Sequence, residues 1–75
     1  MSVSISFADV QRLLTECAPG HTLRLATHFR VVKFNGRVFP TLPKHSNIEL
    51  GHIKKMIRHL LIDKDCAKKH GIIVN

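Results

Sequence analysis

The sequence has few acidic residues: five Asp and Glu stand against twelve Lys and Arg among 75 residues, for a formal charge of +7 and a pI near 10.1. This imbalance excludes a preference for cationic partners. It favours a polyanion, with nucleic acid first, an acidic protein second and an anionic membrane surface third. The excess of positive charge is also concentrated in one part of the chain, because residues 21–62 hold eight basic residues against Glu49 alone. We therefore expect a surface in this part that follows a phosphate backbone.

Cysteine is also scarce. Cys17 lies at an apolar helical position and Cys66 lies in a lysine-rich tail, without the CxxC spacing of zinc sites. We predict that both are reduced thiols of a cytoplasmic protein. No apolar run approaches the ~18 residues of a membrane span, and no basic segment followed by a long apolar run opens the sequence. The sequence thus predicts a protein that neither spans a membrane nor is exported.

Trp and Tyr are absent, and Phe occurs four times. We interpret Phe29, Val31, Val32 and Phe34 mainly as core, because a chain this short buries only about 60% of its unfolded surface and needs every large apolar side chain. RNA would then be contacted through backbone and shape more than through base stacking. The length predicts one domain, residues 1–75, without a deep substrate cavity.

Two segments have helical apolar spacing. The first runs from Phe7 to Ala18, after Ser6 as a helix cap and before Pro19-Gly20 as a terminator. The second runs from Leu50 to Leu61, with Met56 on its flank and no acidic residue on its outer face. We expect a last short helix after Asp63, closed by Gly71. The apolar end at residues 72–74 is either a small fourth strand or an ordered tail.

The segment between the helices favours strands at about 21–26, 28–34 and 37–42, with a hairpin turn at Asn35-Gly36. Pro40 cannot donate a ladder hydrogen bond, so the third strand should be a sheet edge. The order α-β-β-β-α predicts an α+β fold, a two-layer sandwich with both helices on one face of a three-stranded antiparallel sheet. Double-stranded-RNA-binding domains have this layout.

Six histidines could suggest a metal site, but their spacing argues against one. His52 and His59 lie seven residues apart on one helix, roughly 10 Å by helix rise, too far to share a zinc ion with His45. We therefore expect no metal and no cofactor.

His28 has a different setting, because it begins the predicted central strand among Arg24, Arg30, Lys33 and Arg37. An imidazole there can take a proton from a 2′-hydroxyl and return one to the 5′-oxygen, while nearby cations stabilise the charge that develops on phosphorus. The alternative is a histidine that only hydrogen-bonds to the backbone.

Three segments resemble the HicA (YcfA-like) mRNA interferase toxins: Leu25-Ala26-Thr27-His28-Phe29, the stretch from Phe39 through Pro43-Lys44-His45 to Asn47, and the helix residues Leu50 to Ile57. The family pattern is Gly-Ser-His at a strand start, a hairpin, a Val-Pro-Arg-His type loop and a basic helix with Leu-x-x-Ile spacing. Here Ala26 replaces the Gly and Thr27 replaces the Ser while keeping a hydroxyl. The resemblance covers roughly residues 7–62 and leaves 63–75 as an extension.

The resemblance implies a double-stranded-RNA-binding-like fold, metal-independent cleavage of mRNA with His28 as the catalytic residue, and neutralisation by a HicB-like antitoxin protein. Thr27 and His45 are candidate auxiliary groups. The residues expected to bind RNA phosphates are Lys54, Lys55 and Arg58, helped by Lys44, Arg30, Lys33 and Arg37. Two other functions stay open: a non-catalytic double-stranded-RNA-binding module, and a domain whose basic face binds an acidic protein.

Overall fold

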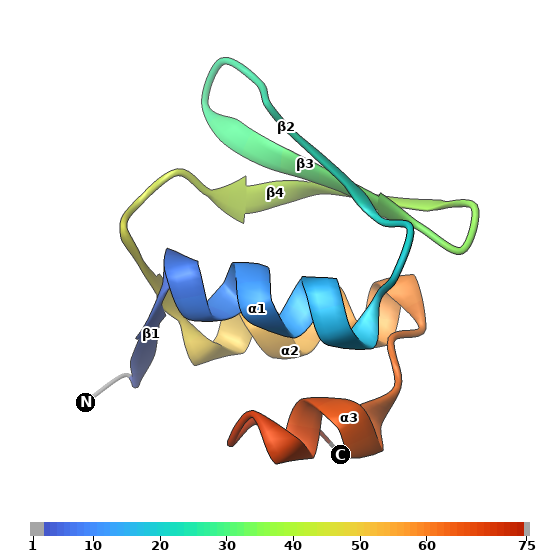
Figure 1. Cartoon of the computed structure of the whole chain (residues 1–75). Coiled ribbons are helices and arrows are strands. Elements are labelled where there is room, and N and C mark those ends of the chain that lie inside the picture. Colours follow the sequence, from blue (N-terminus) through green and yellow to red (C-terminus); the bar gives the residue numbers. More distant parts are fainter. Residues whose placement is uncertain (1–2, 75) are drawn as a thin grey trace.

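This computed structural model describes residues 3–74, in which three helices and five short strands form the fold (Figure 1). The elements are β1 (Ser4–Ser6), α1 (Phe7–Cys17), β2 (Thr22–Leu25), β3 (Phe29–Phe34), β4 (Arg37–Pro43), β5 (Asn47–Glu49), α2 (Leu50–Leu60) and α3 (Lys64–Lys69). The predicted α+β class is confirmed. None of the helices in residues 3–74 is long and apolar enough to cross a membrane.

The main sheet has the strand order β2-β3-β4, and both pairs are antiparallel. The predicted meander is therefore confirmed, with β3 central and Pro40 on the edge strand β4. Asn35 and Gly36 connect β3 to β4 with φ values of 55° and 72°, the positive values that a two-residue hairpin turn requires.

Helices α1 and α2 both lie on one face of this sheet, and α3 lies beyond them, away from the sheet (Figure 1). Ser6 caps α1, since its hydroxyl accepts the Asp9 N–H at 3.3 Å. The apolar stripes of both helices meet the inner face of the sheet. The core they form includes Val10, Leu13, Leu14, Val32, Leu42, Ile53, Ile57 and Leu60.

The C-terminal end of α2 differs from the prediction. Leu61 was expected on the apolar stripe, but the helix ends at Leu60 and Leu61 adopts a left-handed conformation with φ 56°. This turn directs the Leu61 side chain outward, where it is 63% exposed. Met56, expected on the flank of the stripe, is fully buried.

A second small sheet was not predicted. Strand β1 pairs antiparallel with β5, and Phe7 N–H donates to Ser46 O at 2.8 Å beside it. Both strands are three residues long, too short to show an alternating pattern. This pairing ties the segment after β4 to the start of α1.

Residues 62–74 belong to the same core as the rest of the chain. Asp63 caps α3 as predicted, accepting the Asp65 N–H at 2.9 Å, and Gly71 follows the helix with φ 80°. Ile72 and Val74 are buried without forming a strand, so the ordered-tail alternative is correct.

The prediction of two free thiols is wrong, because Cys17 and Cys66 form a disulfide. The bond joins the last residue of α1 to α3 across 49 residues of sequence. The pairing was not predictable from the sequence because it depends on how α3 folds back against α1, and the spacing of residues does not show this. The reduced-thiol argument for a cytoplasmic protein therefore loses its support.

Candidate functional site

Thr27 and His28 form the tip of the turn between β2 and β3. The ladder ends with Leu25 opposite Arg30, and Ala26 N–H then donates to Phe29 O at 2.8 Å. Only Thr27 and His28 lie beyond this pair, and both are exposed. His28 therefore lies one residue before the central strand, whereas the prediction placed it at the strand start. Ala26 is absent from the residues with positive φ, so its side chain is accommodated without backbone strain.

The segment after β4 lies against this turn. Phe29 pairs with Pro43, so one further step along both chains places Lys44 beside His28. The ammonium of Lys44 donates to Thr27 O at 3.1 Å. His45 is the next residue and is exposed. The structure thus brings Lys44 to the Thr27–His28 turn, with His45 as the next residue of the chain.

Arg30 has a structural role instead of the predicted phosphate contact. Its guanidinium is buried, 3.5 Å from the centre of the Phe7 ring, and donates hydrogen bonds to Pro43 O and to His45 O, the latter at 3.1 Å. Desolvation lowers the pKa of Arg30 from its ordinary value, yet a guanidinium still remains charged. Arg30 therefore fixes the backbone of the Lys44–His45 segment opposite the His28 turn.

The other predicted RNA-binding residues lie elsewhere. Lys33 is on the sheet face away from the helices, where it lines a small hollow with Thr22, Arg24 and Val31. Lys54 is half-buried on α2. Arg37, Lys55 and Arg58 meet at a separate hollow between β4 and α2, at the opposite end of β3 from His28.

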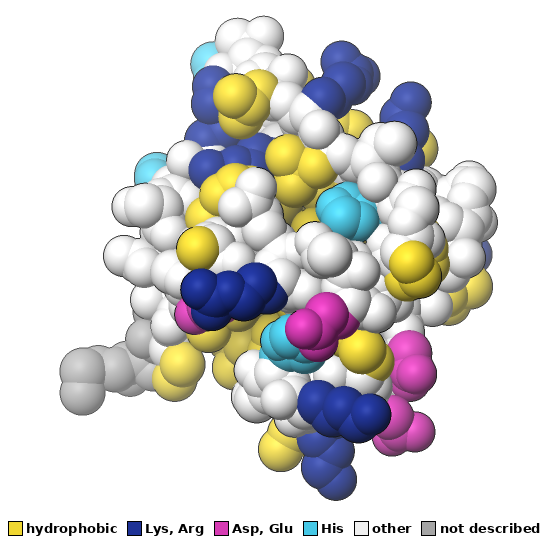
Figure 2. Space-filling model, viewed as in Figure 1, with side chains coloured by type: hydrophobic (Ala, Val, Ile, Leu, Met, Phe, Trp, Pro, Cys, Tyr) yellow, Lys and Arg dark blue, Asp and Glu magenta, His cyan; other side chains and the backbone are white. Residues whose placement is uncertain are grey.

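Acidic groups lie away from the sheet. On the face in Figure 2, Lys and Arg atoms lie over both the sheet and the helical layers, whereas the visible Asp and Glu atoms lie over the helical layers alone. The carboxylates of α1 are Asp9 and Glu16, and they pair with Arg12 and with His70 at 2.7 Å. The sheet and the β4–α2 edge therefore keep a positive field, which supports the predicted phosphate surface.

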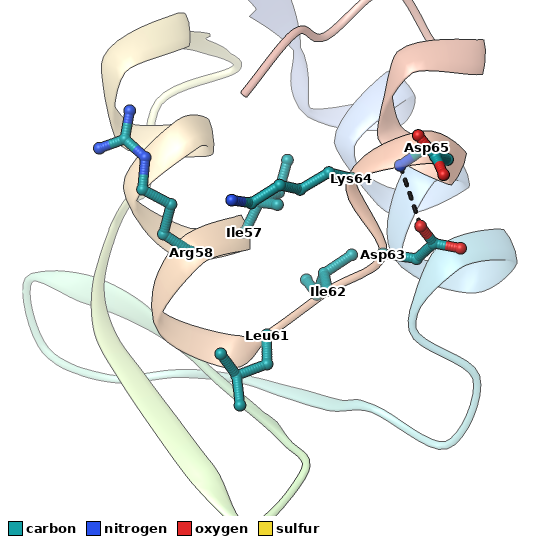
Figure 3. Close-up of a pocket in the computed structure, with 7 residues that line it drawn as sticks. All are labelled: Ile57, Arg58, Leu61, Ile62, Asp63, Lys64 and Asp65. Carbon is teal, nitrogen blue, oxygen red and sulfur yellow. Dashed lines mark hydrogen bonds between the residues drawn. The ribbon is translucent and has the colours of Figure 1, made fainter. Parts of the chain in front are cut away.

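Another hollow does not contain this chemistry. It has a volume of about 660 Å³ and opens where α2 passes to α3 (Figure 3). Its lining has no histidine, and Figure 3 shows the Arg58 side chain extending away from Asp63 and Asp65. Its lining residues are Ile57, Arg58, Leu61, Ile62, Asp63, Lys64 and Asp65. This hollow brings together none of the proposed reacting groups.

The remaining histidines have other surroundings. His21 Nδ1 lies 2.9 Å from Ala18 O, His70 pairs with Glu16, and the His59 ring lies 6.2 Å from the Phe39 ring. Across residues 3–74, no three His, Cys, Asp or Glu side chains are grouped to hold a metal ion.

Sequence reasoning missed two residues near these surfaces. Phe29, interpreted as core, is 43% exposed directly beside His28. His59 lines the β4–α2 hollow, and its place four residues after Lys55 on one helix was the signal that could have included it.

No protein-family model, curated protein or solved structure matches this chain. The resemblance to the HicA toxins therefore rests on the quoted residues and on the site they form.

Proposed function

We propose that this protein is a metal-independent endoribonuclease of HicA-like type, an mRNA interferase that uses His28 as general acid and base. The observation that supports this most is the meeting of two exposed segments that are distant in sequence. The Thr27-His28 turn and the Lys44-His45 segment are joined by the Lys44–Thr27 hydrogen bond. This bond places the Lys44 ammonium at the turn that carries His28, and His45 is the residue that follows Lys44.

In the proposed reaction, His28 accepts the proton of the ribose 2′-hydroxyl, and the 2′-oxygen forms a bond to phosphorus. The bond from phosphorus to the 5′-oxygen breaks, and this oxygen takes a proton from His45 or from the protonated His28. The immediate products are a 2′,3′-cyclic phosphate and a 5′-hydroxyl. Lys44 stabilises the negative charge that grows on the phosphoryl oxygens. Positioned proton transfer of this kind contributes ~10²- to 10⁴-fold in rate.

The same fold supports RNA as the substrate. An α-β-β-β-α arrangement with a basic edge is the layout of double-stranded-RNA-binding domains, which recognise backbone shape and not base sequence. We assign this fold type to the protein as part of the proposal.

A HicB-like antitoxin is the proposed protein partner, and the cytoplasm, where mRNA is found, is the proposed compartment. A reducing cytoplasm would open the Cys17–Cys66 bond. Cleavage should therefore be measured both with and without a thiol reductant.

The decisive experiment compares wild-type protein with His28→Ala on end-labelled RNA in the presence of EDTA. We expect His28→Ala to lower the cleavage rate by at least about 10²-fold with RNA affinity unchanged. His52→Ala is the matched control, because His52 lies on α2 outside the His28 site and the β4–α2 hollow. Cleavage by His28→Ala at the wild-type rate would show that the mechanism is wrong.

A second candidate function is a non-catalytic RNA-binding module. It is favoured by the cations Arg37, Lys55 and Arg58, which form a basic surface without any contribution from His28. In that case the labelled RNA stays intact, and wild-type protein and His28→Ala bind it with equal affinity.

A further inference from the structure

A second positive site lies at the end of the molecule remote from His28. A hollow of about 490 Å³ opens between β4 and α2, lined by Arg37, Phe39, Lys55, Arg58 and His59. Arg37 and Phe39 come from the start of β4, and the other three residues come from the second half of α2. Three cations and an imidazole thus surround one open space.

Protein carboxylates do not neutralise these cations. The lining of the hollow contains no Asp or Glu. The two ion pairs found within residues 3–74 are Arg12–Asp9 and His70–Glu16, which involve neither β4 nor α2. Grouped like charges repel one another, so an arrangement of this kind is best completed by an anion.

Two hydrogen bonds from side chains to backbone oxygens hold the two walls of the hollow together. Arg37 Nη1 donates to His59 O at 3.0 Å, and Asn35 Nδ2 donates to Leu60 O at 3.0 Å. These bonds fix the β3–β4 hairpin to the last turn of α2. They also explain Arg37 as a partner for the carbonyl end of the helix. Arg58 lies in the last turn of α2, where its charge also favours the carbonyl end of the helix. Neither hydrogen bond involves Lys55, which lies one turn earlier.

The distance between the hollow and His28 determines which phosphate along an RNA strand could lie in the hollow. His28 precedes the first residue of β3 and Arg37 pairs with its last, Phe34. A strand of this length separates the two ends by roughly 17 Å. A stacked nucleic-acid strand advances about 3.4 Å per nucleotide. A phosphate in the hollow is therefore several nucleotides away from a phosphate at His28.

We propose that the β4–α2 hollow binds a backbone phosphate of the RNA several nucleotides from the bond that is cleaved. The inference rests on the proposed function for the identity of the polyanion. It adds a second contact that makes affinity depend on RNA length and leaves the chemical step at His28 unaffected. Arg37, Lys55 and Arg58 supply the charge, and the His59 ring lies beside them as a hydrogen-bonding group.

The test uses the pair Lys55→Gln and Arg58→Gln, because both side chains are exposed and their loss leaves the Arg37–His59 bond in place. The matched control is Lys68→Gln with Lys69→Gln on α3, which removes the same charge at exposed positions outside the hollow. All binding is measured by fluorescence anisotropy in a His28→Ala background, so that the RNA stays intact. Circular dichroism verifies that each variant is folded.

We expect the Lys55/Arg58 pair to weaken binding of an RNA of about 20 nucleotides. It should reduce the slope of log K against log salt by about 0.7 to 0.9 for each phosphate contact that is lost. Binding of an RNA of about three nucleotides, too short to reach both sites, should be unchanged. The Lys68/Lys69 control should show neither effect.

Equal weakening by both pairs would attribute the effect to net charge and overturn the proposal. Unchanged RNA affinity with lost affinity for an acidic protein would assign the hollow to a protein partner, and would also overturn it. A wild-type protein that binds RNA without cleaving it, while the Lys55/Arg58 pair still lowers the salt slope, would support the hollow and refute the nuclease. The experiment therefore distinguishes failure of the nuclease proposal from failure of the proposal for the hollow.

Discussion

The Cys17–Cys66 disulfide gives the sharpest stability prediction, because it ties α3 to α1 and closes most of the chain into one loop. We expect reduction of this bond to lower the free energy of unfolding substantially while the fold of α1, α2 and the sheet persists. The buried groups that hold the end of the chain without the bond are Ala67, Ile72 and Val74, together with the Glu16–His70 pair on the surface.

The magnitude follows from the length of the closed loop. The two cysteines are 49 residues apart. Loop-closure entropy for about 50 residues corresponds to about 4 kcal/mol at 25 °C, and measured disulfides mostly contribute about 2 to 4 kcal/mol. For a domain of this size, each kcal/mol shifts Tm by about 4 to 8 °C. We therefore expect reduction to lower Tm by roughly 10 to 30 °C.

Urea unfolding followed by far-ultraviolet circular dichroism is the suitable assay, since the chain has neither Trp nor Tyr for fluorescence. The midpoint should fall on addition of a thiol reductant. Cys66→Ala is the control: its midpoint should already be low and should not respond to reductant.

Two results would refute the reasoning. The first is a thiol titration that finds both cysteines free in protein kept from reductants. The second is a midpoint that reductant does not move in the wild-type protein, which would show that the closed loop adds nothing to stability.

Two substitutions test the backbone around the sites. Arg30→Lys keeps the charge but lacks the planar guanidinium that bonds two carbonyls, so it should cost about 1 to 3 kcal/mol in urea unfolding and slow RNA cleavage; unchanged stability would contradict the structural role of Arg30. Leu61→Gly should raise the free energy of unfolding by up to about 1 kcal/mol, because Gly adopts φ 56° freely and the exposed Leu61 side chain buries little. A lower urea midpoint for Leu61→Gly would show instead that Leu61 packs usefully beside α2.

Much of the fold was predictable because its signals are local. Ser6 and Asp63 cap helices with their own side chains, and Asn35-Gly36 forms a hairpin turn because these two residues accept positive φ. The end of α2 was not predictable in the same way. Leu61 continues the apolar spacing of α2, and only the left-handed turn that leads to α3 removes it from the stripe.

The site was partly predictable for a different reason. The Asn35-Gly36 turn fixes the β3–β4 register near the hairpin, which predicts that the segment after β4 reaches the His28 turn. A register shift between Arg30 and Val32 then moves the pairing by one residue, so that Lys44 and not Pro43 lies opposite His28. The β1–β5 pair and the disulfide join segments whose separation in sequence carries no such rule. Both therefore had to be seen in the structure.

Arg30 shows how composition can mislead about a binding surface. Side chains alternate between the two faces of a strand, and Arg30 lies in β3 two residues before the core residue Val32. Its position on the strand therefore pointed inward, although its charge suggested a phosphate contact. The Arg30 guanidinium contributes to the chain's net charge, but its hydrogen bonds go to Pro43 and His45 of the protein backbone. The net charge of the chain thus predicts the sign of the partner's charge, whereas strand register decides which basic side chains can contact that partner.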